Sequence, residues 1–333
     1  MKGTKAIIMG FLQKLLNYQD ICIQCHNNPD PDTIASALAI YSYLKSHNIN
    51  ARIVYGGTQV IEKSNLNLMI KKCNIPIEYT HNISKPELLL LVDCQYAQGN
   101  VEKFEADNIM IIDHHIPVVD ITDSYIIDSS YQCCSTIIWN LLLEENFPVN
   151  KYPELVIALL YGLYTDTASF TELYNHNDLT MKNQLYQKQP LFEQLTKANM
   201  SLAEFMISTE ALHNHYFDIN RRFAIIDVLK CDQSILGIIG DFIIQVDLVL
   251  LSFAYTENDI SYQISLRSCH PHLPANTIAA YIYDGIGSGG GHANKAGGRI
   301  IKDKIYEKYG QQNIFTLVNT LLCQYMDENN ITF

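Results

Sequence analysis

The sequence lacks any run of about 20 consecutive apolar residues, the length that a helix needs to cross a bilayer. It is also poor in basic residues, because 23 Lys and Arg face 35 Asp and Glu and give a formal net charge of -12. Sequence-independent binding of long nucleic acid requires a basic surface. We therefore expect no membrane segment and no binding of long duplex nucleic acid, whereas a small phosphorylated substrate stays open.

The nine cysteines do not suggest a disulfide framework, because their number is odd and they are scattered through apolar segments. This usage is typical of reduced thiols and predicts a cytoplasmic protein. Cys22 and Cys25 form a single C-x-x-C pattern inside a predicted strand, which without a second pair indicates core cysteines rather than a metal site. Cys133 and Cys134 are interpreted in the same way.

The length of 333 residues suggests about two domains. Near the start, apolar residues recur at helical spacing over 7–16 and no small-residue cleavage site follows, so an amphipathic helix is predicted rather than a signal peptide. The first domain then alternates predicted strands and helices. The strands are 21–25, 51–55, 88–92 and 109–112, and the helices are 33–46, 62–72, 134–145 and 152–165. Continuous apolar strands are typical of parallel sheets covered by helices on both faces, so we predict a doubly wound α/β domain.

The parallel-sheet pattern stops at about residue 171, where the chain becomes more polar and helical. We predict a first domain over 1–190, a helical linker over 191–214 and a smaller α/β domain over 215–333, with the active site in the cleft between them. In the second domain the predicted strands are 222–229, 234–240, 248–255, 261–267 and 299–301, the predicted helices are 275–283 and 314–326, and a glycine-rich loop, GSGGGHANKAGG, precedes the last strand.

Polar residues follow the apolar strands of the first domain, at 26–32, at Asp93 and at 113–115. Open α/β sheets place their active sites at these carboxyl ends. His26, Asp30 and Asp32 put an imidazole and two carboxylates on one proline-stiffened loop, a ligand set that suits a divalent ion such as manganese. A solvated turn is the alternative for this loop, and helix capping is the alternative for Asp93.

Two further segments add candidate ligands. His114 and His115 are adjacent, so only one of them would bind a given metal and the other would face a substrate phosphate. Asp166 ends an apolar helix, where a carboxylate opposes the helix dipole unless a cation neutralises it. Together these residues offer enough ligands for two metals that share a bridging carboxylate, an arrangement that activates water and stabilises phosphoryl charge.

The H-x-x-P-D-x-D loop, the isolated Asp93, the D-H-H and the later T-D-T resemble the four motifs of the DHH phosphoesterases. The segment GGGHANKAGG is similar to the glycine-rich motif of the DHH-associated C-terminal domain, and 264–268 resembles its arginine-bearing strand. The resemblance covers about residues 20–302 and is nearest to the branch of oligoribonucleases (nano-RNases) and pAp phosphatases.

This resemblance implies roles for individual residues. His26, Asp30 and Asp93 would hold one manganese, and Asp32, Asp93, His114 and Asp166 would hold the other, with Asp93 bridging. Asp93, Asp113, His114 and His115 form the implied catalytic set, in which His115 contacts the substrate phosphate and Asp113 orients the histidines. Magnesium and cobalt are alternative ions.

The second domain is expected to bind the substrate. Backbone N–H groups of Gly289, Gly290 and Gly291 could approach a phosphate closely, and Arg267 and His292 suit phosphate contact. Asn294 and Lys295 complete the expected substrate-binding set. Within 261–304 five Lys or Arg and two Asp give a local charge of +3. A glycine loop that merely turns the chain is the alternative.

We therefore expect a two-metal hydrolase of short single-stranded oligonucleotides, of pAp-like nucleotide phosphates, or of both. The alternatives are a phosphodiesterase for cyclic or linear dinucleotide signals, an exopolyphosphatase or pyrophosphatase, and a nucleotide-binding regulator without catalysis. A homodimer is left open.

Overall fold

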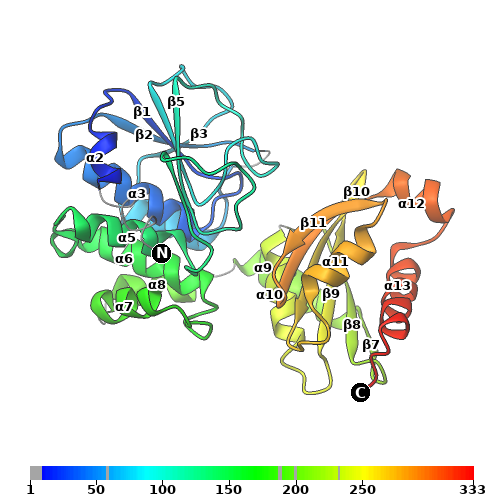
Figure 1. Cartoon of the computed structure of the whole chain (residues 1–333). Helices are drawn as coiled ribbons and strands as arrows, with labels where there is room; N and C mark the ends of the chain where they lie inside the picture. The colour runs from blue at the N-terminus through cyan, green and yellow to red at the C-terminus, as the bar shows by residue number, and fades with distance from the viewer. Residues whose placement is uncertain (1–9, 58–59, 187–189, 199–200, 232) are drawn as a thin grey trace. The chain divides into compact units, whose positions relative to one another are not determined.

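The computed structural model describes residues 10–57, 60–186, 190–198, 201–231 and 233–333, and Figure 1 shows their course. The chain divides into two compact units, Met1–Asn199 and Met200–Phe333. Within the described residues, no helix combines the length and apolarity that crossing a bilayer requires. Helix α2 (Phe11–Leu15) covers part of the amphipathic helix predicted over 7–16, and residues 7–9 of that prediction lie outside the described residues.

The first unit is built on six strands that pair in parallel throughout, in the order β3-β2-β1-β4-β5-β6. The strands are β1 (Ile21–Gln24), β2 (Ala51–Tyr55), β3 (Ile77–Tyr79), β4 (Leu88–Val92), β5 (Asn108–Asp113) and β6 (Tyr125–Ile127). This order is that of doubly wound sheets, in which the chain reverses direction across the sheet between β1 and β4. The predicted α/β class and the mainly parallel sheet are confirmed.

The remaining helices of the first unit are α3 (Pro31–Ser46), α4 (Ser64–Lys72), α5 (Cys134–Glu144), the short 3-10 helix η1 (Val149–Lys151), α6 (Pro153–Asp166), α7 (His176–Leu185) and α8 (Pro190–Lys197). Helices α3 and α5 pack on one face of the sheet and α6 packs on both of them. Successive strand residues point to opposite faces, so Ile21 and Ile23 join this helical core and Cys22 joins a second cluster.

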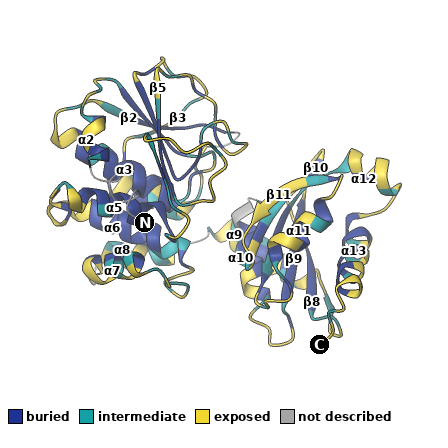
Figure 2. Ribbon diagram, in the orientation of Figure 1, coloured by how far each residue is buried: buried dark blue, intermediate teal, exposed yellow. Residues whose placement is uncertain are grey.

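The second face of this sheet is covered differently from the prediction of helices on both faces. Its apolar cluster includes Cys94, Val101 and Phe104, which belong to the non-helical connection between β4 and β5. Both faces are nevertheless buried, and Figure 2 shows the strands as a dark layer within the unit. The apolar strands are therefore explained by burial, with an irregular segment in place of a helix on one side.

The second unit contains a mixed sheet in the order β11-β12-β10-β9-β8-β7, in which only β8 and β9 pair in parallel. Its strands are β7 (His215–Asp218), β8 (Phe223–Val228), β9 (Leu251–Glu257), β10 (Ser261–Ser268), β11 (Gly287–Gly291) and β12 (Lys295–Ile301). Its helices are α9 (Leu202–His213), α10 (Gln233–Ile243), α11 (Ala275–Tyr283), α12 (Lys302–Tyr309) and α13 (Ile314–Glu328). Helices α9 and α10 cover one face, and α11 and α13 cover the other.

Two predictions for this unit were wrong. The segment 234–240 is part of α10 and not a strand, because Ile235, Leu236 and Ile239 fall on one buried helical face. The glycine-rich segment is not an open loop but a β-hairpin, in which Gly289 pairs with Gly298. The predicted linker region contains α8, which belongs to the first unit, and α9, which belongs to the second.

Candidate metal centre

The carboxyl ends of β1, β4 and β5 and the end of α6 bring the predicted ligands of the first unit together. Three groups of side chains each place their ligand atoms within 4.8 Å of one another. The groups are His26, Asp30 and Asp93; Asp32, His114 and Asp166; and Asp93, His114 and His115. The cluster lies where the strand order reverses between β1 and β4, the position at which open α/β sheets bind ligands.

Asp93 lies at the middle of this cluster, with its side chain only 2% exposed. One carboxylate oxygen, Oδ2, is 3.5 Å from Nε2 of His26, and the other, Oδ1, is 3.2 Å from Nε2 of His114. The Oδ1 atom is buried and has no hydrogen-bond partner in the described part of the chain. A buried carboxylate oxygen without a donor is costly, and a divalent ion beside it would satisfy it. The residue also has φ +60°, a left-handed conformation that Asp tolerates better than most residues.

Asp30 has two functions in this geometry. Its Oδ1 accepts hydrogen bonds from the backbone N–H groups of Asp32 and Thr33 and so caps α3. Its Oδ2 lies 3.6 Å from Nε2 of His26. Burial would raise the pKa of Asp30, but the His26 imidazole and the cap hydrogen bonds lower it overall. The Asp30 carboxylate is therefore ionised and available beside His26.

Asp32 is fully buried and is held by the beginning of α5. Its carboxylate accepts hydrogen bonds from the backbone N–H of Cys134 at 2.6 Å, from that of Ser135 at 2.9 Å, and from the Ser135 hydroxyl. Burial and then the charge of Asp93 raise the pKa of Asp32 to about 7. Because a cation would lower this pKa again, Asp32 is suited to binding a metal in exchange for a proton.

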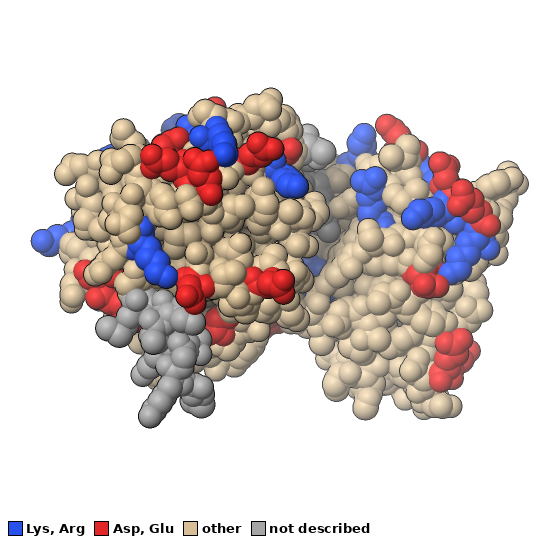
Figure 3. All heavy atoms as spheres, turned by 45° about the horizontal axis from the view of Figure 1, so that its top comes forward, with Lys and Arg blue, Asp and Glu red and all other residues tan. Residues whose placement is uncertain are grey.

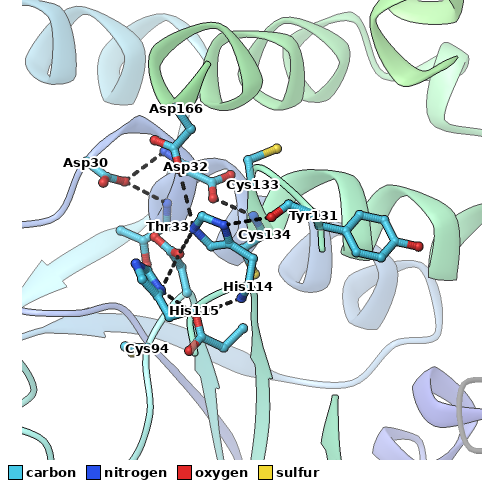
Figure 4. A network of polar contacts seen from close by, with 12 residues as sticks. Asp30, Asp32, Thr33, Cys94, His114, His115, Tyr131, Cys133, Cys134 and Asp166 are labelled. Carbon is cyan, nitrogen blue, oxygen red and sulfur yellow. Dashed lines mark hydrogen bonds and ion pairs between the residues drawn. The ribbon is translucent and has the colours of Figure 1, made fainter. Parts of the chain in front are cut away.

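His114 lies between Asp32 and Asp166 on one side and His115 on the other (Figure 4). Its Nε2 is 3.5 Å from Oδ2 of Asp166, and its Nδ1 is 3.4 Å from the carbonyl oxygen of Tyr131. A proton on Nδ1, donated to that carbonyl, leaves the Nε2 lone pair for a metal. Burial, followed by the charges of Asp32 and Asp30, raises the pKa of Asp166 at the carboxyl end of α6. The cost of ionising Asp166 therefore comes from burial and from the neighbouring carboxylates, and a cation would offset it.

Asp113 and His115 form a pair at the rim of the cluster. Oδ1 of Asp113 accepts from Nδ1 of His115 at 2.8 Å and from the backbone N–H of His114 at 2.8 Å. Oδ2 of Asp113 accepts from Nε2 of Gln95 at 2.7 Å. Burial would raise the pKa of Asp113, but His115 and Gln95 lower it overall. Asp113 thus orients the ring of His115, whereas it reaches only the backbone of His114.

The imidazoles respond to the surrounding carboxylates. Burial would lower the pKa of His26 and of His114. The pKa of His26 is nevertheless raised by the hydrogen bonds that its ring donates to Asp30 and Asp93, and that of His114 is raised by Asp93 and Asp166. The neighbouring carboxylates therefore favour the protonated form of both rings, and a divalent ion would compete with these protons. The donor set of carboxylate oxygens and imidazole nitrogens fits a divalent ion such as manganese.

The second unit contains the predicted substrate-binding residues other than His115, and the sheet register places Arg267 in β10 opposite Lys295 in β12. Arg267 in β10 donates from Nε to Oδ1 of Asp241 in α10 at 2.6 Å and from Nη1 to the Ser265 hydroxyl at 2.9 Å. Its guanidinium crosses α10 where Gly237 and Gly240 leave room. Arg267 thus contacts Asp241, a partner that no sequence pattern predicted.

The glycine hairpin places the other predicted contacts at the edge of the second sheet. Gly289, Gly290 and Gly291 are exposed in β11, the turn to β12 carries His292 and Asn294, and Lys295 begins β12. The backbone N–H of His292 donates to the carbonyl of Lys295 at 2.7 Å and closes this turn. The N–H of Ser268 donates to the carbonyl of Asn294 at 2.9 Å, which fixes the turn on the end of β10.

Comparison with known proteins supports the fold described above. The family described as DHH family, N-terminal domain, matches residues 20–163. An uncharacterized protein of Methanocaldococcus jannaschii is 26% identical over 324 residues, covering 89% of this chain and 92% of that protein. A probable manganese-dependent inorganic pyrophosphatase of Clostridium acetobutylicum is 32% identical over 136 residues, covering 39% of this chain and 43% of that protein. The crystal structure of an exopolyphosphatase-related protein from Bacteroides fragilis has a TM-score of 0.73 at 19% identity and covers 98% of both chains, so the two share a fold.

The fold and the cluster of possible metal ligands are those expected of a metal-dependent phosphoester hydrolase. Residues 20–163 match the N-terminal domain of the DHH family, which agrees with the motifs found in this part of the sequence.

Proposed function

We propose that this DHH-family hydrolase cleaves short single-stranded oligonucleotides, pAp-like nucleotide phosphates, or both, and that it uses two divalent ions, with manganese as the expected metal. The observation that carries this proposal is the position of Asp93, whose two oxygens face the imidazoles of two different ligand groups. A carboxylate in that position is suited to bridging two ions.

In this proposal His26 and Asp30 hold one ion, Asp32, His114 and Asp166 hold the other, and Asp93 is common to both. Bound divalent ions would lower the pKa of a bound water and offset the charge of a phosphoryl group. His115 uses its Nδ1 proton to bond Asp113, so its Nε2 is the nitrogen left to contact a substrate phosphate. Gln95 and Asp113 hold this ring in place.

The substrate class is inferred from charge and from the second unit. On the face shown in Figure 3, Lys and Arg lie among Asp and Glu on both units, which suits a small phosphorylated molecule better than a long polyanion. Arg267, His292, Asn294 and Lys295 would contact the substrate together with the N–H groups of 289–291. A backbone that carries no side chains can approach a phosphate closely.

The names of two relatives add other substrates to be compared. One relative is called a manganese-dependent inorganic pyrophosphatase and another an exopolyphosphatase-related protein. A cytoplasmic location and a homodimer remain part of the proposal. All nine cysteines lie in the described residues and none forms a disulfide, which supports a reducing compartment.

The test is release of phosphate or mononucleotide by the purified chain with manganese. The substrates are an RNA dinucleotide, pAp, a cyclic dinucleotide, pyrophosphate and polyphosphate, and Asp93→Asn is the control. Asn tolerates the left-handed conformation at this position, so the variant should keep its fold and lose turnover. Fastest cleavage of the dinucleotide or pAp supports the proposal. Preference for pyrophosphate or polyphosphate would mean that the substrates are inorganic phosphates and not nucleotides. Bound metal without any turnover would favour a non-catalytic regulator.

A further inference from the structure

Gln132 connects two segments of the first unit that are distant in sequence. Its side chain is buried in the turn before α5, where Nε2 donates to the carbonyl of Glu172. Its Oε1 accepts from the backbone N–H groups of Tyr174 at 2.8 Å and Asn175 at 3.1 Å. The turn before α5 is therefore tied to the segment that leads into α7.

Asp178 makes the same connection in the opposite direction. It lies in the first turn of α7, is fully buried, and accepts from the backbone N–H of Gln132 at 2.9 Å through Oδ2. Its other oxygen has no hydrogen-bond partner in the described part of the chain. Each residue thus uses its side chain to hold the other's backbone segment, and we call this reciprocal pair the α5–α7 brace.

The segments held by the α5–α7 brace support three of the proposed ligands. On one side of Gln132, the carbonyl of Tyr131 lies 3.4 Å from Nδ1 of His114. On the other side, the N–H groups of Cys134 and Ser135 hold Asp32.

The third ligand, Asp166, lies at the end of α6, just before the segment that the Gln132 side chain holds. Directly after it the chain turns through Ala168, Ser169 and Phe170, all with positive φ, and the N–H of Glu172 closes this turn on the carbonyl of Thr167 at 3.0 Å. Three consecutive non-glycine residues in this conformation are strained and need support from their surroundings. The α5–α7 brace supplies this support, because Gln132 donates a hydrogen bond to the Glu172 carbonyl.

We propose that Gln132 and Asp178 are positioning residues that fix one of the two metal sites, the group of Asp32, His114 and Asp166, and leave the group of His26 and Asp30 independent. None of the hydrogen bonds of the brace within the described residues reaches the loop of His26 and Asp30. The inference rests on the proposed function in one respect, namely that both groups bind a divalent ion.

The direct test is a titration of the protein with manganese in the absence of substrate. The electron paramagnetic resonance signal of free Mn²⁺ measures how much of the metal is bound. The wild-type chain should bind two ions. Asp178→Ala and Gln132→Ala should each lower the affinity for one ion by about tenfold or more and leave the affinity for the other ion unchanged. This size is typical for the loss of residues that orient metal ligands. Asp178→Asn should bind like wild type, because its amide oxygen can still accept from the Gln132 N–H.

Double variants identify the ion that is affected. Asp178→Ala combined with Asp30→Asn should weaken the binding of both ions. Asp178→Ala combined with Asp166→Asn should bind manganese about as well as Asp166→Asn alone, because both changes act on one site. The matched control is Asn65→Ala, which removes a hydrogen bond of 2.9 Å from Asn65 to the Tyr161 hydroxyl without touching the brace. Thermal unfolding of the same samples separates local from global effects, and Gln132→Ala serves if Asp178→Ala does not fold.

Wild-type affinity for both ions in Asp178→Ala and Gln132→Ala, or equal weakening of both ions, would overturn the proposal. Binding of a single ion by the wild-type chain would overturn it as well. If the wild-type chain binds two ions but cleaves none of the substrates, the proposed function fails while the selective loss of one ion still supports the brace.

Discussion

Ser135 holds the carboxylate of Asp32 twice, through its backbone N–H at 2.9 Å and through its hydroxyl. Ser135→Ala keeps the backbone contact and removes the second. Because the hydroxyl lowers the pKa of Asp32, its loss should raise that pKa further and increase competition between protons and metal. We expect weaker manganese binding, most clearly at low pH, and a stability loss of about 1 kcal/mol.

Isothermal titration with manganese at two pH values measures this effect. Ser42→Ala is the matched control, because the Ser42 hydroxyl donates to the carbonyl of Leu38 within α3 and makes no hydrogen bond to Asp32. Equal affinities of the two variants would show that the Ser135 hydroxyl does not contribute to the site.

Gly162 in α6 lies against this same contact. An added Cβ would be 2.6 Å from the Ser135 hydroxyl oxygen and 3.1 Å from Oδ1 of Asp32. Gly162→Ala should therefore push α6 away from the site, cost about 1–3 kcal/mol from overpacking, and reduce turnover. Gly99→Ala is the control, since no atom lies within 4 Å of its added Cβ. Urea unfolding and a turnover assay test both variants, and a Gly162→Ala protein with normal activity would contradict the expected displacement of Asp32.

Gly289 and Gly290 separate packing from substrate contact in the hairpin. A Cβ on Gly289 would lie 2.2 Å from the carbonyl of Gly297 and 2.5 Å from the Tyr283 ring, whereas a Cβ on Gly290 meets nothing within 4 Å. Gly289→Ala should destabilise the second unit. Gly290→Ala should keep its stability and raise KM about tenfold if one charge-assisted hydrogen bond to a phosphate is lost.

Steady-state kinetics with the best substrate, together with thermal unfolding, measure both outcomes. Wild-type KM in a stable Gly290→Ala protein would remove Gly290 from the proposed substrate contacts.

The parts of the fold that could be predicted are those determined by local pattern. The apolar runs that end in Asp93 and Asp113 show buried strands and their polar ends directly in the sequence. In contrast, β3 and β6 have three residues each and lie at the edges of the sheet, too short for a periodic signal. The proposed ligands come from segments of this visible kind, and the structure brings them together.

Interactions between distant segments explain what could not be predicted. The apolar run 234–240 fits a buried strand as well as a buried helix, so its pattern alone does not decide between them. The role of Gly237 and Gly240, which make room for Arg267, becomes visible only when α10 is packed against β10. Likewise, Ser135 and Gln95 carry no motif, because their value lies in the carboxylates that they reach across the sheet, Asp32 and Asp113. Residues that orient ligands are thus the least visible part of the site.

The pH dependence of stability tests the buried state of Asp178. Burial raises its pKa above the value of about 3.9 expected in the unfolded chain. Below that value the carboxyl is protonated in both states and adds no ionic penalty. As the pH rises through the higher pKa of the folded state, the unfolded chain binds fewer protons than the folded one, so the wild-type protein loses stability. Asp178→Asn cannot ionise and escapes this loss.

The free energy of unfolding of Asp178→Asn, relative to wild type, should therefore increase as the pH rises above about 4. Urea unfolding without added metal at several pH values measures the difference, since other titrating groups are common to both proteins and cancel. Asn65→Ala provides the reference, because it removes an uncharged hydrogen bond and its difference from wild type should stay constant with pH. A constant difference for Asp178→Asn as well would mean that the pKa of Asp178 is not raised in the folded protein. The Asp178 carboxylate would then not be buried away from water, as its place in the α5–α7 brace requires.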